Sequence, residues 1–420
     1  MTNIPLLTVH SISCHDLQKP AGPLQTGIGF LDHMLDQINS HAQMGISLVL
    51  EGDFHNKNRH ASHDPVKFLS LVGKTVGTAL LPYVTNHKQQ QQQQQQQQPV
   101  VVVITSFSCP LDEALVECQL SCVAPEQAGC EYIHFTPLGK YSRTHLGQLN
   151  VAQLDVFWEA LAQAAQLKLV FTKVRGDNAH HIIESSFKAF SRALRNSIDA
   201  TDLYTAESRN AQASIALQRQ ASLQRSTKET SIAVELQLDG GRPAGSQIST
   251  GLPTLDRFWT RVADAAQLTL NIAATGDLWI DEHHTAEDVA IAVGQCFDQA
   301  LGSKAGLNRM WSCSTSDDLL QVIMDLSNRP CLVHNLHWET EFVDPAGDLS
   351  CEMMEHVLES WVVNARWTVH IVQNNPTSSR RRAVTVDDLA MALGTAVRYC
   401  CSVDVRRAGA TASSKGTLSV

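Results

Sequence analysis

The motif His180-His181-Ile182-Ile183-Glu184 organises this sequence, and a second copy, His283-His284-Thr285-Ala286-Glu287, follows about a hundred residues later. Each copy starts an amphipathic helical pattern, so its first histidine and its glutamate share one helix face. Adjacent histidines point about 100° apart, so one pair can serve two metal ions. Imidazole and carboxylate donors without cysteine suit Mn, Fe, Zn or Ni. A single copy also fits surface or capping histidines, whereas two copies in register predict a metal site.

A unit of strand, polar loop and helix recurs four times along the chain. Apolar residues are continuous or alternate in the expected strands and follow a period of about 3.6 in the expected helices. The strands are expected to begin at Ile46, Leu167, Leu268 and Trp367. The helices are expected to end near Leu80, Leu194, Leu301 and Val397.

The four units group into two halves. Residues 26–32 (TGIGFLD) match residues 250–256 (TGLPTLD), and Gly52-Asp53 matches Gly276-Asp277 with the same offset of 224 positions. A constant offset over this span predicts a tandem duplication. The first copy is expected at residues 1–203 and the second at 204–420, with the boundary in a polar stretch.

The composition excludes several classes of protein. The net charge is −10 and the pI about 6.0, which argues against general nucleic-acid binding. No apolar run reaches the length that spans a membrane. The 11 cysteines form no CxxC motif and no secretory signal is seen, which favours reduced thiols in the cytoplasm, with a plastid location left open. The run Gln89–Gln98 is expected to be a flexible surface loop.

Four segments resemble imidazoleglycerol-phosphate dehydratase, an enzyme family of histidine biosynthesis. They are residues 26–37, 176–188, 276–288 and 413–418. A family member carries all of these motifs in one copy of about half this length. The resemblance implies an α+β fold in which each copy has two βα repeats, with helices packed between mostly antiparallel sheets (ribosomal protein S5 domain 2-like). It also implies a large homo-oligomer, twelve chains if the fused copies replace the twenty-four of the family.

The resemblance further implies two Mn(2+) ions per complete site, held by histidines and glutamates. The first half keeps His33, His180, His181 and Glu184 of this set, and the second half keeps His283, His284, Glu287 and His370. Each half has lost what the other keeps. The first half has Arg59-His60-Ala61-Ser62-His63 and Val170 at the lost positions, and the second half has Arg257 and the stretch from Ala383 to Asp387. For His33 and His370, a role as a buried core histidine is the alternative.

The residues expected to bind substrate divide in the same way. Gln37 and Lys188 come from the first half, and Arg309, Arg329, Ser413, Ser414 and Lys415 come from the second as the groups that hold a phosphate. For Arg309 and Arg329, an ordinary surface role is the alternative. Catalysis is assigned by the resemblance to Glu229 as the general base, with His33, Glu184 and Glu287.

The implied activity is that of a carbon–oxygen hydro-lyase. It converts a small-molecule phosphate, imidazole glycerol phosphate, to imidazole acetol phosphate, at di-metal sites shared between the halves. The alternatives are a degenerate pseudoenzyme, a metal-binding structural or assembly subunit, and a gene model that joins two genes. The reciprocal losses favour the enzyme, because random decay would not leave one complete set of ligands.

Overall fold

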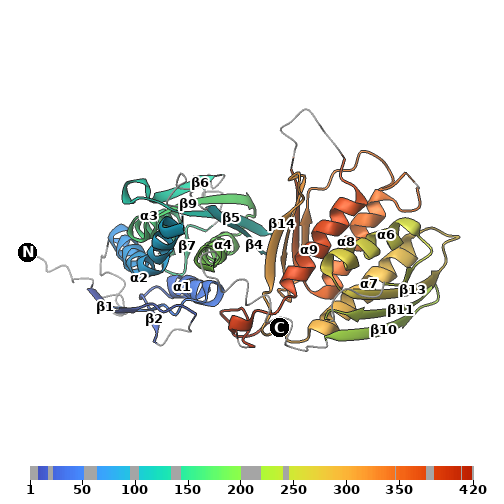
Figure 1. The fold of residues 1–420 in the computed structure, drawn as a ribbon, viewed down its shortest axis with the longest axis horizontal. Coiled ribbons are helices and arrows are strands. Elements are labelled where there is room, and N and C mark those ends of the chain that lie inside the picture. Colours follow the sequence, from blue (N-terminus) through green and yellow to red (C-terminus); the bar gives the residue numbers. More distant parts are fainter. Residues whose placement is uncertain are drawn as a thin grey trace, which may run out of the picture. The chain divides into compact units, whose positions relative to one another are not determined.

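The structure is a computed structural model in which contacts divide the chain into two compact units (Figure 1). The first unit is Met1–Arg209 with Ser413–Lys415, and the second is Asn210–Ala412 with Gly416–Val420. The expected boundary between residues 203 and 204 lies outside the described residues. The structure describes residues 8–17, 22–51, 64–94, 104–133, 143–199, 219–239, 246–345, 347–374, 383–407 and 409–418.

Among its described residues, the first unit has two larger sheets and four α-helices. The first sheet has the order β1-β3-β2 and the second β4-β5-β9-β6. The strands are β1 (Thr8–Ser13), β2 (Leu24–Gln25), β3 (Ser47–Glu51), β4 (Ile104–Leu111), β5 (Ala114–Cys122), β6 (Gly129–Ile133) and β9 (Leu167–Arg175), with the short pair β7 (His145–Leu146) and β8 (Leu149–Asn150). The helices are α1 (Gly29–Ala42), α2 (Pro65–Gln94), α3 (Leu154–Ala165) and α4 (Ala179–Asp199).

The second unit repeats this plan. Its sheets have the orders β10-β11-β13-β12 and β14-β15-β17-β16, the same pattern as β4-β5-β9-β6. The strands are β10 (Gln220–Ser226), β11 (Thr230–Gln237), β12 (Ile248–Ser249), β13 (Thr269–Gly276), β14 (Met310–Ser314), β15 (Leu320–Asp325), β16 (Cys331–His334) and β17 (Thr368–Gln373). The helices, which lie between the two sheets (Figure 1), are α6 (Pro253–Ala266), α7 (His283–Leu301), α8 (Cys351–Ala365) and α9 (Val386–Cys400).

Each of the four larger sheets is antiparallel except for one parallel pair of strands. In each repeat, a helix that precedes a central strand ends in a residue with left-handed backbone. These residues are Gln43, Gln166, Gln267 and Arg366, with φ between 55° and 59°. The left-handed residue satisfies terminal carbonyls and reverses the chain into the strand. The expected α+β fold and the tandem duplication are confirmed.

Glycines let paired helices approach closely. A Cβ at Gly294 of α7 would lie 2.7 Å from the Trp361 carbonyl oxygen of α8, and one at Gly394 of α9 would lie 2.5 Å from the Val262 carbonyl oxygen of α6. Gly73 in α2 contacts α3 in the same way. The helix that follows one central strand therefore packs on the helix that precedes the other. This crossed pairing of helices positions the functional site.

Aromatic side chains fill the space between helices and sheets. In the first unit, the ring of Trp158 lies 4.4 Å from that of Phe187 and 5.1 Å from that of Phe190, measured between centroids. In the second unit, Trp361 packs against Trp259 at 5.0 Å, and both side chains are fully buried. Truncating such a residue to alanine typically costs about 3–5 kcal/mol. This buried aromatic packing therefore fixes the position of the helix pairs in each unit.

Two expectations about helices are resolved by the structure. α7 ends at Leu301 as expected, but α2 continues past Leu80 to Gln94. Gln89–Gln94 are thus helical, and the loop predicted for them is wrong; the remainder of the glutamine run lies outside the described residues. Glutamine is a good helix former, so the run can extend a helix already nucleated by its apolar part. Within the described part of the chain, no helix has the length and apolar character that crossing a bilayer requires.

Candidate metal centre and substrate site

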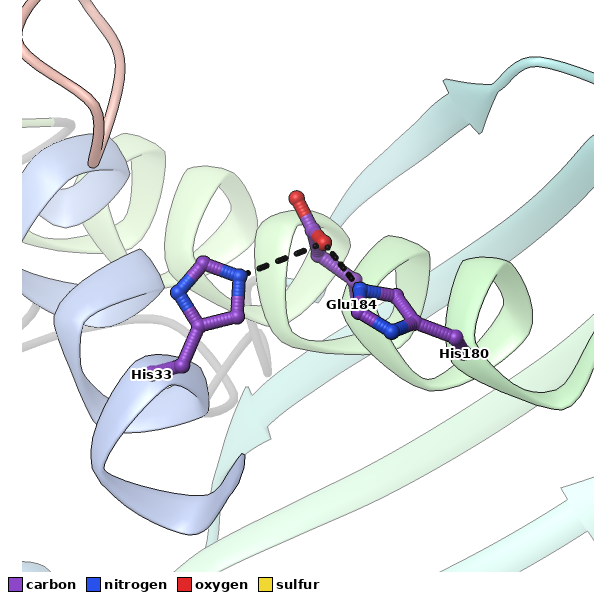
Figure 2. A group of neighbouring side chains, drawn as sticks. All are labelled: His33, His180 and Glu184. Carbon is purple, nitrogen blue, oxygen red and sulfur yellow. Dashed lines mark hydrogen bonds and ion pairs between the residues drawn. The ribbon is translucent and has the colours of Figure 1, made fainter. Parts of the chain in front are cut away.

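In the first unit, His33 of α1 meets His180 and Glu184 of α4 (Figure 2). Glu184 Oε2 lies 3.1 Å from His180 Nε2 and 3.5 Å from His33 Nε2. One donor atom from each of the three residues falls within 4.8 Å of the others, and all three side chains are half-buried. The structure thus brings together three of the residues that the sequence predicts as metal ligands.

The start of α4 sets the direction of this motif. Gly176 has φ of +112°, and a Cβ there would lie 2.8 Å from Ala114, so the turn out of β9 requires glycine. The Asn178 side chain then accepts a hydrogen bond from the His180 N–H at 2.9 Å, as a residue at a helix N-cap does. His180 and Glu184 follow on the face of α4 that meets α1.

Lys188, one turn beyond Glu184, is buried beside the cluster. Its Nζ lies 2.7 Å from Glu184 Oε1, and only 4% of its side chain is exposed. Burial opposes the shift, but the Lys188 ammonium and the hydrogen bonds from His180 and His33 hold the pKa of Glu184 far below its ordinary value. The carboxylate therefore stays ionised and available to a cation.

In the second unit, a cluster of the same kind joins His283 and Glu287 of α7 with His356 of α8. Glu287 Oε2 lies 3.5 Å from His283 Nε2, and Glu287 Oε1 lies 3.3 Å from His356 Nε2. The rings of His283 and His356 are 5.1 Å apart between centroids. The second unit thus offers the same donor types, two imidazoles and one carboxylate, as the first.

His356 was missed from the sequence, and His370 was chosen in its place. His370 is completely buried in β17, between β15 and β16, and is absent from the donor clusters of the described residues. A signal for His356 existed: it lies ten positions before the left-handed Arg366, as His33 lies ten before Gln43. The structure therefore favours His356 over His370 as the donor from this half.

The second histidine of each motif turns to a carboxylate outside the cluster. His181 Nδ1 lies 2.7 Å from Glu113 Oε2, in the turn between β4 and β5, and His284 Nδ1 lies 3.0 Å from Asp277 Oδ2. Burial opposes the shift, but the His181 hydrogen bond lowers the pKa of Glu113. The hydrogen bond to Asp277 raises the pKa of His284. Such partners fix the orientation of the imidazole ring, and His181 Nε2 also lies 3.7 Å from Asp112 Oδ2. Sequence reasoning assigned no role to these carboxylates.

The other helix pair of the second unit carries an ion pair instead of a histidine cluster. Arg257 of α6 lies ten positions before Gln267 and so occupies the place of His33 in the repeat. Its Nε is 3.4 Å from Asp387 Oδ1 of α9, and Arg261 Nε is 3.5 Å from the same oxygen. In the first unit the matching position of α3 is Val156, and residues 59–63 lie outside the described residues. A guanidinium is always protonated and cannot ligate a metal.

The residues expected to bind phosphate lie in different surroundings. Arg309 is buried. Its Nε and Nη2 donate hydrogen bonds to the Asp325 carboxylate at 2.6 and 2.8 Å, and its Nη1 donates to the Ala412 carbonyl oxygen. Arg329 is half-buried, and its backbone N–H and carbonyl oxygen both bond to the Ser327 hydroxyl. Their phosphate-binding role stays a prediction.

Two further groups of predicted residues are placed by the structure. In the first unit, buried Gln37 donates through Nε2 to Ser414 Oγ at 2.9 Å, and Lys415 donates its backbone N–H to Ser413 Oγ at 3.1 Å. In the second unit, Glu229 is exposed in the turn between β10 and β11, and the pKa of His284 is raised first by its hydrogen bond to Asp277 and then by the charge of Glu229.

The two clusters fit a divalent transition metal by their chemistry. Each supplies two imidazole nitrogens and a carboxylate oxygen, with no thiolate, a donor set compatible with Mn, Fe, Zn or Ni. His33, His180 and Glu184 would hold the ion in the first unit, and His283, Glu287 and His356 in the second. Three protein ligands leave coordination positions for further donors.

Comparison with known proteins identifies the same family. The family model named imidazoleglycerol-phosphate dehydratase matches residues 26–194 and again residues 250–397. A chloroplastic imidazoleglycerol-phosphate dehydratase of Pisum sativum is 38% identical over 203 residues, which are 48% of this chain and 69% of that protein. The enzyme of Gloeobacter violaceus is 37% identical over 203 residues, covering 98% of its own length.

A crystal structure of the dehydratase from Staphylococcus aureus matches 44% of this chain and 99% of its own, with 24% identity and a TM-score of 0.37. The two ranges matched by the family model together span most of the sequence. The chain therefore belongs to the imidazoleglycerol-phosphate dehydratase family, with two copies of the family domain in tandem.

Proposed function

We propose that this chain dehydrates imidazole glycerol phosphate to imidazole acetol phosphate in histidine biosynthesis, at Mn(2+) sites to which both halves contribute. The observation that carries the proposal is the complementarity of the two clusters. The first unit retains donors on α1 and α4, whereas the second retains them on α7 and α8. In the repeat these are opposite helix pairs, so the two units keep different parts of one ligand set.

The outward histidines supply the link between the parts. These outward histidines, His181 and His284, bind carboxylates outside their own clusters through Nδ1. Their Nε2 atoms, of which that of His181 lies 3.7 Å from Asp112 Oδ2, would bind a metal ion beyond the unit. A cluster in one unit would then be completed by the outward histidine of the other, from the same chain or from a neighbouring chain. Six donors in the two clusters and two outward histidines make one set of eight.

The chain's own residues account for the chemistry of dehydration. Bound Mn(2+) would supply Lewis acidity to the imidazole nitrogens of the substrate. Glu229, an exposed carboxylate near His284, is the proposed general base for the proton on carbon. Lys188, Arg329 and the segment Ser413–Lys415 would bind the phosphate, and Gln37 would position that segment through Ser414. Arg309, which is buried, would also help to bind the substrate phosphate.

The fused chain is further proposed to form a large homo-oligomer of twelve chains, because a site completed from outside one unit needs a second unit against it. Mass measurement in solution tests this. A reducing compartment such as the cytoplasm suits the cysteines, none of which forms a disulfide in the described part of the chain.

Rescue of a histidine auxotroph that lacks the dehydratase tests the proposed function. The full chain is expected to restore growth, and residues 1–203 or 204–420 expressed alone are not. Failure of the well-expressed, metal-loaded full chain would favour the pseudoenzyme alternative. Growth supported by one half alone would contradict the shared site.

A further inference from the structure

Buried residues flank the segment Ser413–Lys415 on both sides. Ala412 is 1% exposed and Leu418 is 8% exposed. The carbonyl oxygens of both accept hydrogen bonds from side chains of the second unit, Ala412 from Arg309 Nη1 and Leu418 from Asn328 Nδ2 at 2.6 Å. The C-terminal segment is therefore tied down before and after the residues proposed to bind phosphate.

The first tie is built around Arg309, which is 4% exposed. Two of its nitrogens bind both oxygens of the buried Asp325 carboxylate, which fixes the plane of the guanidinium. That geometry leaves Nη1 to donate to Ala412. Nearby, the Gly306 N–H donates to the Ala410 carbonyl oxygen at 3.0 Å, so the segment before the loop has a second support.

The second tie is built around Lys304 and Asn328. Lys304 is 1% exposed, its Nζ donates to Asn328 Oδ1, and Asp298 Oδ1 lies 3.6 Å away. An ammonium group can only donate hydrogen bonds, so the amide oxygen of Asn328 must face Lys304. The amide nitrogen must then face Leu418. Lys304 thus determines which way the Asn328 amide points.

The backbone around these ties is unusual. Lys304, Arg309 and Asn328 have φ values of 57°, 75° and 58°, in the left-handed region that residues with a Cβ rarely adopt. Disfavoured backbone of this kind persists where surrounding contacts hold it, and it gathers at functional sites. Here, three such residues surround one short terminal segment.

We propose that Lys304 and Asn328 are positioning residues which, together with Arg309, clamp both ends of the phosphate-binding segment Ser413–Lys415. Neither residue needs to touch the substrate. They act through Leu418, by limiting the positions that the hydroxyls of Ser413 and Ser414 and the ammonium of Lys415 can reach. This proposal rests on the proposed function, in which these three residues bind the substrate phosphate.

Asn328→Gly is the sharpest variant, because glycine accepts the left-handed backbone while the amide is removed. In the full metal-loaded chain, amide hydrogen exchange of the peptide containing residues 409–418 is expected to be about fivefold faster, since one buried hydrogen bond is lost. KM for imidazole glycerol phosphate is expected to rise by about the same factor, with kcat and bound metal nearly unchanged.

Lys304→Met is the second variant, and it should produce the same two changes by releasing the Asn328 amide. Asn335→Ala is the matched control, because Asn335 also donates its amide to a backbone carbonyl of the second unit, that of Gln373, away from the C-terminus. It should leave the exchange of the terminal peptide and KM as in the native chain.

Unchanged exchange of the terminal peptide in both Asn328→Gly and Lys304→Met would overturn the clamp. Faster exchange with an unchanged KM would leave the clamp standing and would instead contradict the phosphate role that the proposed function gives to Ser413–Lys415. Faster exchange with a raised KM supports both. Metal content, measured on the same samples, reports whether each variant has folded around its histidine clusters.

Discussion

His33 and His356 occupy the same position of the fourfold repeat, one in each half of the chain. Each lies ten residues before the left-handed residue that ends its helix, Gln43 or Arg366. Each also lies beside the glutamate of a HHxxE motif on the helix that packs against its own. His33 Nε2 is 3.5 Å from Glu184 Oε2, and His356 Nε2 is 3.3 Å from Glu287 Oε1. The two equivalent positions that remain carry Val156 and Arg257. One histidine per unit has therefore been kept, on opposite helix pairs.

His356→Ala is expected to reduce bound metal sharply, whereas His370→Gln is expected to keep it. His356 offers Nε2 to the cluster, but His370 is fully buried within a sheet, so its loss should cost about 1–3 kcal/mol of unfolding free energy instead. Elemental analysis and urea unfolding of both variants measure these effects. Metal lost from His370→Gln and retained by His356→Ala would restore the original ligand assignment.

Asp277→Asn and Glu113→Gln should each weaken metal binding by roughly 10–100-fold without abolishing it, because these carboxylates orient the ligating histidines and do not ligate. Competition with a chelating indicator measures the affinity. Glu282→Gln is a suitable control, since this neighbouring carboxylate accepts from the Ser350 backbone N–H and not from a histidine. Equal effects of all three changes would argue for a general electrostatic cause.

The native chain is expected to bind two Mn(2+) ions, not four, because Arg257 and Asp387 replace a histidine cluster on α6 and α9. Rebuilding that cluster with Arg257→His, Ala383→His and Asp387→Glu together should add metal binding. Titration followed by elemental analysis counts the ions. Close to four ions in the native chain would contradict the division of ligands between the halves.

Asp239→Asn is expected to lower the stability of the second unit by about 1 kcal/mol at neutral pH. Burial opposes the shift, but the Arg219 hydrogen bonds lower the pKa of Asp239, and both side chains are partly buried. A carboxylate with a lowered folded pKa stabilises above its unfolded pKa of about 3.9, and loses that contribution as the pH falls through the folded pKa. Denaturant unfolding of native and variant chains should therefore differ at pH 7 and converge in acid.

Much of the fold could be predicted because the helix and strand periods and the duplicated motifs are local properties of the sequence. The extent of α2 could not, since glutamines carry no stop signal and continue a nucleated helix through Gln94. The choice between His356 and His370 also escaped local reasoning. Each histidine corresponds in the first half to a valine 200 positions earlier in the sequence, Val156 for His356 and Val170 for His370. Only burial and the position of α8 beside α7 separate them.

The partners of the outward histidines were equally hidden. Glu113 lies in a hairpin turn some seventy residues before His181, and nothing in its local sequence marks it as a histidine partner. The position of such a residue depends on sheet pairing, here β5 with β9, which brings the hairpin turn to the start of α4. Long-range pairing of this kind is fixed by the tertiary structure and not by residue type.

The most direct test of the central claim is kcat/KM of the full chain carrying either His33→Ala or His356→Ala, with metal content measured on the same samples. If the halves supply complementary parts of one site, each single change removes a ligand from every site, and both variants should fall below about one hundredth of native activity. If each half instead held a complete site of its own, each variant would keep about half of the native activity and half of the metal. That result would contradict the account.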